Sequence, residues 1–232
     1  DVWNKVKAVA KEDALFATNT SGIPIEYISK VFSGEERQRF FGMHFFNPPR
    51  IMKLVEIIPL KDTAVESVER AQDFAEDKLG KGVVIANDVP GFVANRVGTQ
   101  TMNDVMYRAE KEGLSITDTD ALTGRSIGRP SLGTYGLVDL VGLDIAMAVT
   151  KGLQQVPGEK EFFHDTVLAE KLMEKGALGR KTKQGFYKKE KKGILVFHPE
   201  SNDYVEQSQP AFEILGKFTK DLKKNMDTIF NA

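Results

Sequence analysis

The sequence predicts an α/β fold followed by an all-α region, and two observations support this prediction. Over residues 1–88, short apolar runs with the length of buried strands alternate with helical patterns, which is the order of elements in an α/β sheet. After residue 89, helical patterns follow one another, each set off by Gly or Pro. We therefore predict a domain boundary near residue 89.

The first region contains four short apolar runs that we expect to form strands. Each is bounded by polar residues, glycine or proline, which favours a buried strand over a helix. The expected strands cover residues 14–18, 40–46, 52–58 and 82–86. Helical spacing of apolar residues predicts helices at residues 1–11, 23–31 and 63–79. Residues 47–50 hold two prolines, which cannot continue a strand ladder, so a turn is expected there.

The second region begins with a long predicted helix over residues 91–112. Asp88 can cap this helix, and Pro90 suits its first turn. Further helices are predicted at residues 117–123, 135–153 and 165–175. Residues 185–205 have the pattern of a small hairpin, and the last predicted helix covers residues 210–232. The apolar face of that last helix consists of Phe212, Leu215, Phe218, Leu222, Met226 and Ile229.

The composition excludes several classes of protein. Lys and Arg number 32 against 33 Asp and Glu, so the formal net charge of -1 argues against a dedicated nucleic-acid binder. The absence of Cys excludes disulfides, thiolate zinc sites and Cys nucleophiles. The three His residues are far apart in sequence, so no metal site is expected. No apolar run approaches the roughly 20 residues of a membrane span, and no signal peptide opens the chain. We expect a soluble, cytoplasmic protein.

The first residues have the pattern of a helix that is already under way. Residue 1 is Asp and not Met, and Val2, Val6, Val9 and Ala10 lie on one helical face. The opening has the character of the middle of a domain. We therefore expect a fragment, or a chain that was cut by proteolysis.

An ionisable residue interrupts each of two neighbouring apolar strands. If the two strands pair antiparallel about a turn centred near residue 50, His44 and Glu56 are equidistant from that centre and face each other. Directly opposed residues have Cβ atoms roughly 4.5–5.5 Å apart, which allows a hydrogen bond. A carboxylate beside an imidazole fixes its tautomer and makes it a better general base. The alternative is a structural His–Glu pair that closes a sheet edge.

Two further polar residues stand where ligands commonly bind. Ser21 follows the first predicted strand, and ligands of open α/β sheets bind at strand ends; the alternative is an ordinary polar turn. Asn95 lies near the start of the long helix, where its amide can stabilise a developing oxyanion; the alternative is a solvent-facing Asn. Residues 179–187 are basic and flanked by Gly, but they lack the spacing of a P-loop. No Gly-x-Gly-x-x-Gly motif occurs in the sequence.

Taken together, six segments of the sequence resemble the 3-hydroxyacyl-CoA dehydrogenase family of fatty-acid β-oxidation. They follow one another in the family's order and extend over about three quarters of the chain. The segments are FATNTSGI (16–23), GMHFFNPP (42–49), MKLVEII (52–58), NDVPGFVANR (87–96), LVDLVGLD (137–144) and GRKTKQGFY (179–187).

The resemblance implies a Rossmann-like NAD-binding domain and a helical C-terminal domain through which the protein forms a homodimer. It implies oxidation of an L-3-hydroxyacyl-CoA to the 3-oxoacyl-CoA, with hydride transfer to NAD. By the same resemblance, His44 is the catalytic base, Glu56 pairs with it, and Asn95 helps to hold the substrate oxygen. Ser21 is expected to contact both substrate and nicotinamide, and Asn47 and Lys181 match positions linked to bound NAD.

The sequence departs from the family pattern in three places. The glycine-rich turn for the pyrophosphate is missing, so we expect the chain to lack the N-terminal half of the NAD-binding domain. Family members also commonly carry Gly where this sequence has Lys183, and Pro where it has Thr134, which affects the local turns. An alternative function is therefore a non-catalytic dimerisation or acyl-CoA-binding fragment of a larger protein. A third possibility keeps the enzyme class but changes the substrate to another β-hydroxy acid.

The resemblance also divides the chain into three parts. Residues 1–89 correspond to the C-terminal part of the NAD-binding domain, and residues 90–190 to the helical C-terminal domain. Residues 191–232 are expected to form a hairpin and a helical connector, of the kind found in longer members that continue into further domains such as an enoyl-CoA hydratase.

Overall fold

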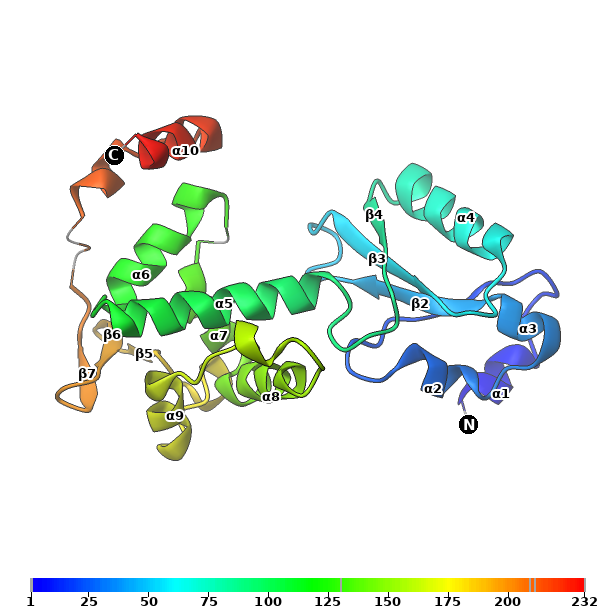
Figure 1. The fold of residues 1–232 in the computed structure, drawn as a ribbon, viewed down its shortest axis with the longest axis horizontal. Helices are drawn as coiled ribbons and strands as arrows, with labels where there is room; N and C mark the ends of the chain where they lie inside the picture. Colours follow the sequence, from blue (N-terminus) through cyan, green and yellow to red (C-terminus); the bar gives the residue numbers. More distant parts are fainter. Residues whose placement is uncertain (1, 130, 209, 211, 232) are drawn as a thin grey trace. The chain divides into compact units, whose positions relative to one another are not determined.

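The computed structural model describes residues 2–129, 131–208, 210 and 212–231. The chain forms two compact units, Asp1–Val97 and Gly98–Ala232. The division falls inside helix α5 (Ala94–Lys111), whereas the predicted domain boundary lies near residue 89. Figure 1 shows the four-stranded sheet of the first unit and the helices of the second. The starting residue Asp1, on which part of the fragment hypothesis depends, lies outside the described residues.

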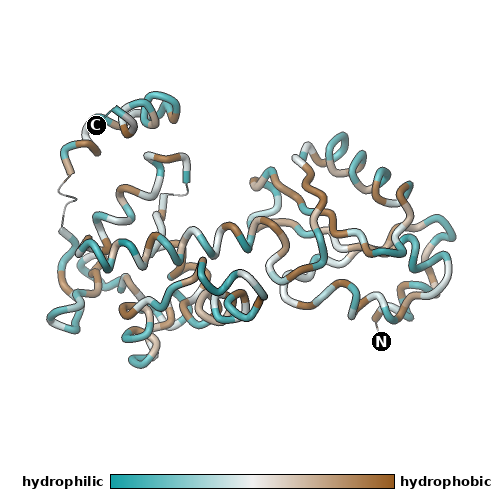
Figure 2. Tube along the Cα trace, in the orientation of Figure 1, coloured by the Kyte–Doolittle hydropathy of each residue, from teal (hydrophilic) through white to brown (hydrophobic). Residues whose placement is uncertain are grey.

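The first unit is built on a mixed sheet in the order β1-β2-β3-β4. The central pair, β2 with β3, is antiparallel, and both outer pairs are parallel. All four predicted strands are confirmed, and Figure 2 shows them as a largely apolar part of this unit. The strands are β1 (Phe16–Thr18), β2 (Phe40–Phe45), β3 (Leu54–Pro59) and β4 (Gly82–Ile85).

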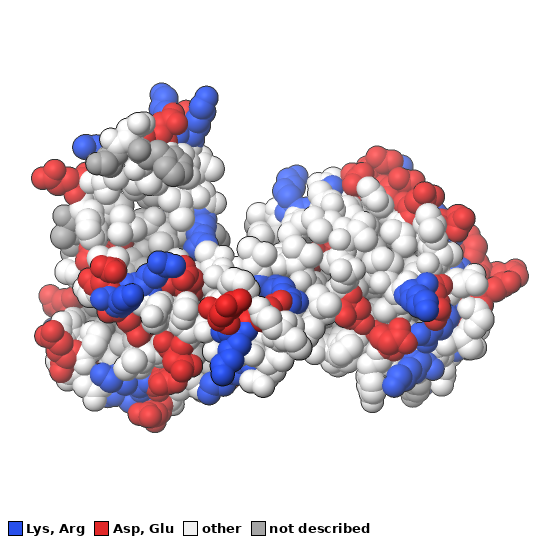
Figure 3. Space-filling model, viewed as in Figure 1, with Lys and Arg blue, Asp and Glu red and all other residues white. Residues whose placement is uncertain are grey.

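Helices cover both faces of this sheet, as Figure 1 shows. The helix α4 (Val65–Asp73), extended by a π-helical turn (Phe74–Lys78), packs Ala71 and Ala75 onto one face. Acidic side chains occupy its outer side (Figure 3). The other face carries α1 (Val2–Lys7), α2 (Ile25–Ser29) and α3 (Gly34–Gln38). The sequence does not predict α3, because its five residues include four charged or amide side chains and none is buried.

Alternation along the central strands assigns their side chains to these two faces. Val55 and Ile57 of β3 belong to the apolar cluster under α4. Ile58 belongs to the cluster on the opposite face, together with Phe16, Phe40 and Phe92. The period of two therefore places Glu56 on this second face, and the strand pairing brings His44 to the same face.

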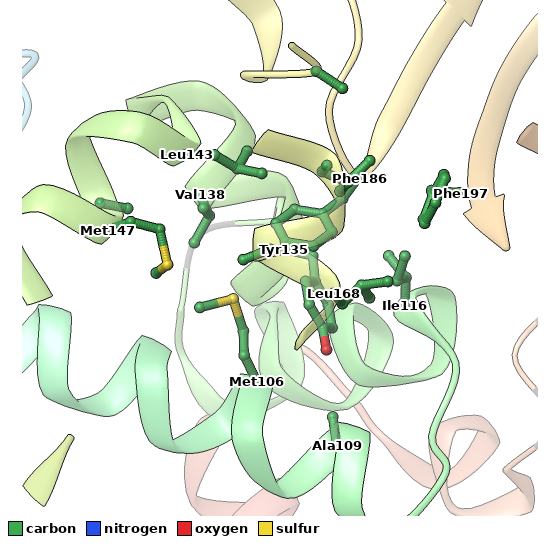
Figure 4. Close-up of a cluster of buried hydrophobic side chains, with 14 of the residues drawn as sticks. Met106, Ala109, Ile116, Tyr135, Val138, Leu143, Met147, Leu168, Phe186 and Phe197 are labelled. Carbon is green, nitrogen blue, oxygen red and sulfur yellow. The ribbon is translucent and has the colours of Figure 1, made fainter. Parts of the chain in front are cut away.

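The second unit is mainly helical and ends in a small antiparallel sheet. Its core, drawn in Figure 4, surrounds Tyr135 and Phe186, which are both almost completely buried. Its helices after α5 are α6 (Ile116–Thr123), α7 (Gly133–Val141), α8 (Leu143–Gln154), α9 (Val167–Glu174) and α10 (Leu222–Phe230). The sheet consists of β5 (Tyr187–Glu190), β6 (Gly193–His198) and β7 (Asp203–Glu206). Short 3-10 turns are Arg125–Ile127, Lys160–Phe162, Arg180–Thr182 and Glu213–Lys217.

Three predictions for the second unit are wrong in detail. The single helix predicted over residues 135–153 is two helices, because Gly142 between them has a φ of 103°, outside the helical range. The predicted hairpin carries a third strand, β7, paired with β6.

The single helix predicted over 210–232 is also wrong, since the structure has a 3-10 turn followed by α10. The side chain of Asn225 is buried and bonds to the backbone N–H and C=O of Thr219, which holds the chain away from a helical path before Asp221 caps α10. Of the predicted range, residues 211 and 232 lie outside the described residues.

The basic segment 179–187 folds around a buried carboxylate. Asp139 in α7 accepts hydrogen bonds from the backbone N–H groups of Phe186 and Tyr187, both at 2.8 Å. A Cβ at Gly185 would lie 2.0 Å from Asp139 Oδ1, so only glycine fits there. Lys183 in the same segment has a φ of 63°, the left-handed conformation that glycine adopts most easily. The segment thus keeps its turn even though Lys183 stands where the family commonly has glycine.

Replacing Gly185 by Ala is expected to lower the free energy of unfolding by about 3 kcal/mol, because the new methyl group overlaps the Asp139 carboxylate. Gly152→Ala is the matched control, since nothing lies within 4 Å of its added Cβ and it sits in α8. That change is expected to stabilise by up to about 1 kcal/mol. Thermal unfolding followed by circular dichroism measures both, and equal melting temperatures for the two variants would contradict the packing described here.

Candidate active site

The His44–Glu56 pair predicted from the strand register is present. His44 and Glu56 are directly opposed in the β2–β3 ladder, and Nδ1 of the imidazole lies 2.7 Å from Oε2 of the carboxylate. The two residues are 6% and 0% exposed. A pair at this depth is held by the sheet itself, because both partners are in the central strands.

The second carboxylate oxygen of Glu56 binds the start of helix α5. Oε1 accepts hydrogen bonds from the backbone N–H groups of Val93 and Ala94, at 2.9 and 2.8 Å. Burial alone favours the neutral acid, but the hydrogen bonds from His44, Ala94 and Val93 outweigh it and lower the pKa of Glu56. Glu56 is therefore an ionised carboxylate with all three of its donors in place at neutral pH.

The ionised carboxylate determines the protonation of the imidazole ring. An ionised Glu56 can only accept, so the hydrogen on the shared bond belongs to Nδ1 of His44. In the neutral ring this leaves a lone pair on Nε2, the nitrogen that can act as a base. The rings of Phe46 and Phe92 contact the imidazole, with centroids at 4.6 and 5.5 Å. The arrangement is an oriented imidazole in an apolar environment, a geometry that suits a general base.

The segment containing Ser21 lies beside the end of β2. β1 runs parallel to β2. Asn19, the residue directly after β1, accepts a hydrogen bond from the backbone N–H of Phe45 at 2.8 Å. Phe45 directly follows His44, so the polar turn and the base are at the same edge of the sheet. Ser21 itself is exposed. Carboxyl ends of parallel strands are the usual ligand-binding edge of such sheets.

The other predicted site residues are Asn95, Asn47 and Lys181, which are less closely connected to the His44–Glu56 pair. Asn95 is half-buried in the first turn of α5, immediately after the Ala94 amide that binds Glu56. Asn47 is exposed just beyond β2, and its peptide bond to Pro48 is cis. Lys181 belongs to the second unit, where its ammonium group forms an ion pair with Asp144 and lowers the pKa of that carboxyl.

The predicted capping role of Asp88 is wrong. Asp88 does not cap the long helix; its carboxylate accepts the backbone N–H groups of Ile25 and Glu26 at the start of α2. At the start of α5, the carboxylate of Glu56 accepts the backbone N–H groups instead, although Glu56 lies 37 residues upstream of Val93. In the second unit, His164 stacks on Tyr107 with ring centroids 4.0 Å apart.

Sequence reasoning missed two acids of the second unit, the half-buried Asp120 and the buried Asp139. Asp120 accepts the backbone N–H groups of Tyr135 and Gly136 and the hydroxyl of Tyr187. Burial raises the pKa of Asp120 to about 6 and that of Asp139 to about 6, in spite of these hydrogen bonds. Asp139 lies in the LVDLVGLD segment, so the resemblance contained a signal for its importance. Within the described ranges, no group of three or more acidic or His residues is arranged to hold a metal ion.

Comparisons with known proteins identify the family. The family described as the NAD-binding domain of 3-hydroxyacyl-CoA dehydrogenase matches residues 1–89, and that described as its C-terminal domain matches residues 91–189. The chain belongs to the 3-hydroxyacyl-CoA dehydrogenase family. The expectation that the chain lacks the N-terminal half of the NAD-binding domain is therefore wrong, since the model of that domain matches residues 1–89. What the 232 residues do not contain is a Gly-x-Gly-x-x-Gly motif.

Individual relatives agree with this assignment. A probable 3-hydroxyacyl-CoA dehydrogenase of Deinococcus radiodurans is 44% identical over 82% of the chain and 55% of its own length. One of Bacillus subtilis is 38% identical over 94% of the chain and 28% of its own length. The crystal structure of (S)-3-hydroxybutyryl-CoA dehydrogenase from Ralstonia eutropha matches 79% of this chain and 63% of that one, with 29% identity and a TM-score of 0.68. The chain therefore spans about half or less of the two curated relatives named here.

Glu56→Gln is expected to reduce the free energy of unfolding at pH 7 by about 1–2 kcal/mol, because charge-assisted hydrogen bonds become neutral ones. The lowered pKa gives this effect a direction with pH. The ionised Glu56 stabilises the fold fully above its unfolded-state pKa near 4.5. This stabilisation disappears as the pH falls through the lower folded-state pKa. The stability gap between wild type and Glu56→Gln should therefore narrow below pH 4.5, as measured by urea unfolding at several pH values.

Glu69→Gln provides the control for this experiment, because Glu69 is exposed in α4. It should change stability little at any pH. A gap for Glu56→Gln that stays constant or widens with acid would contradict the ionised, donor-saturated carboxylate.

Proposed function

We propose that this chain carries the acid–base centre of an NAD-dependent 3-hydroxyacyl-CoA dehydrogenase, which oxidises L-3-hydroxyacyl-CoA to 3-oxoacyl-CoA in fatty-acid β-oxidation. The observation that carries the proposal is the buried His44–Glu56 pair, at 2.7 Å, at the ligand-binding edge of the sheet. Family membership supports the reaction class. The names of the relatives support acyl-CoA thioesters as substrates.

In the proposed reaction, Nε2 of His44 takes the proton of the C3 hydroxyl group. As the imidazole becomes charged, the ionised Glu56 stabilises it through Nδ1. We assign the hydroxyl of Ser21 and the amide of Asn95 as donors to the substrate oxygen. NAD, when bound, supplies the acceptor for the hydride that leaves C3. The products balance as a ketone, a reduced nicotinamide and a protonated His44.

The chain fits the nicotinamide end of the cofactor better than its pyrophosphate end. Ser21 and Asn47 are both exposed beside the strand ends that carry His44, which suits contact with the nicotinamide. We retain Lys181 as a further NAD contact on the resemblance. No Gly-x-Gly-x-x-Gly is available for the pyrophosphate, and the first amides of α2 are already bound by Asp88. This observation favours a second candidate, an acyl-CoA-binding or dimerisation module without activity of its own.

Other features of the whole protein are also proposals. Exposed apolar side chains on α7 and α8 support a homodimer formed through the helical domain: Leu140, Val141, Ile145 and Val149. The matched residues support the division into 1–89, 90–190 and a connector over 191–232. In the part of the chain that the structure describes, no helix has the length and apolar character needed to span a bilayer. Cytoplasmic location and the lack of a nucleic-acid partner stay predictions.

His44→Gln is expected to reduce NADH oxidation with acetoacetyl-CoA by at least about 100-fold, because it removes the general base. The matched control is His164→Gln, which removes an imidazole of the second unit and should leave turnover within about twofold. Circular dichroism should show that both variants remain folded. Equal activity of His44→Gln and wild type would disprove the assignment.

The second candidate is distinguished by binding. If the chain is catalytic, isothermal titration calorimetry of the wild-type chain should detect binding of NADH and binding of acetoacetyl-CoA. Binding of acetoacetyl-CoA alone, without turnover, would favour the non-catalytic module.

A further inference from the structure

Phe92 combines an unusual backbone conformation with a position against the candidate base. Its φ is 46°, in the left-handed region that bulky residues rarely occupy, and it is only 4% exposed. Among the described residues, the others with positive φ apart from glycine are Lys183 and Asn202, and neither is in the first unit. An unfavourable conformation that persists at a buried site indicates that the surrounding contacts require it.

The backbone of Phe92 delivers two amides to Glu56. Its own N–H closes a turn onto the carbonyl of Val89 at 3.0 Å. The next two N–H groups, of Val93 and Ala94, then point at Oε1 of Glu56. The reversal at Phe92 therefore brings the start of α5 onto the carboxylate that holds the imidazole.

The side chain of Phe92 reaches the imidazole directly. Its ring centroid lies 5.5 Å from that of His44 with the planes at 60°, and the Phe46 ring lies 4.6 Å away at 68°. The hydrogen bond at Nδ1 restrains one atom of the imidazole but still permits limited rocking of the ring about its side-chain torsions. Two aromatic contacts on the ring oppose this rocking and so direct Nε2.

We propose that Phe92 is a positioning residue for His44: its ring fixes the plane of the imidazole, and its left-handed backbone is what allows the ring and the Glu56 amides to be placed together. Two measurements test this proposal. Turnover rests on the proposed function, whereas the mobility of the His44 ring does not.

Phe32 offers a matched comparison within the same apolar cluster. It is 3% exposed, close to the value for Phe92, and it packs on Trp3, Phe16 and Phe40. No ring contact between Phe32 and His44 occurs in the described structure. A change at Phe32 therefore reports the cost of losing a buried ring without touching the base.

The test compares Phe92→Leu with Phe32→Leu. Both substitutions keep an apolar side chain with a Cβ and remove a ring, so both should lower the melting temperature to a similar extent. Phe92→Leu is expected to lower kcat by about 10- to 100-fold with KM changed less than about threefold, since misplacing a base by an ångström has effects of this size. Phe32→Leu should leave kcat unchanged.

Proton NMR of the imidazole ring provides the readout that needs no activity. The sequence has three His residues, and His44→Gln identifies the signals of His44. These signals should be sharp in wild type and Phe32→Leu but broadened by ring motion in Phe92→Leu. Unchanged His44 signals in Phe92→Leu would overturn the proposal, whatever the turnover. An inactive wild-type chain with the expected broadening would reject the proposed function and leave the positioning role in place.

Discussion

The buried carboxylate of Glu56 is the contact on which the first unit depends. It has no exposed surface, and a charge at that depth is stable only when its hydrogen bonds are complete. Three donors complete them: the imidazole of His44 and the amides of Val93 and Ala94. These donors come from β2 and from the start of α5, while Glu56 itself is in β3. One side chain thus joins two strands and a helix and at the same time orients the imidazole of His44.

Two acids of the second unit also accept backbone N–H groups, but their pKa shifts in the opposite direction to that of Glu56. Asp120 and Asp139 each receive two backbone amides, which tie α6 to α7 and α7 to the start of β5. The pKa of each is raised to about 6, whereas that of Glu56 is lowered. Desolvation by burial favours the neutral acid at all three sites, and at Asp120 and Asp139 it outweighs the hydrogen bonds. At Glu56 the hydrogen bonds from His44, Ala94 and Val93 outweigh desolvation instead.

Much of the fold and the central pair could be predicted from the sequence. Four apolar runs gave four strands, and equal distances of His44 and Glu56 from the turn gave their pairing, because both depend on local periodicity. What failed depends on contacts between distant residues. The binding of Asp88 at α2 crosses 63 positions, and nothing near Glu56 in sequence indicates the amides it holds at α5. The left-handed conformation of Phe92 likewise cannot be predicted from the sequence pattern, because tertiary packing imposes a conformation that this residue type disfavours.

The ionised Glu56 fixes which nitrogen of His44 keeps a free lone pair. This effect can be measured by nitrogen-15 NMR of the neutral imidazole in wild type and Glu56→Gln. We predict the Nδ1–H tautomer in wild type. In Glu56→Gln, we expect the side-chain carbonyl to keep the Val93 and Ala94 amides while its NH2 group donates to Nδ1, which shifts the proton to Nε2, the nitrogen that we propose as the base. The same tautomer in both proteins would show that Glu56 does not determine the protonation of His44.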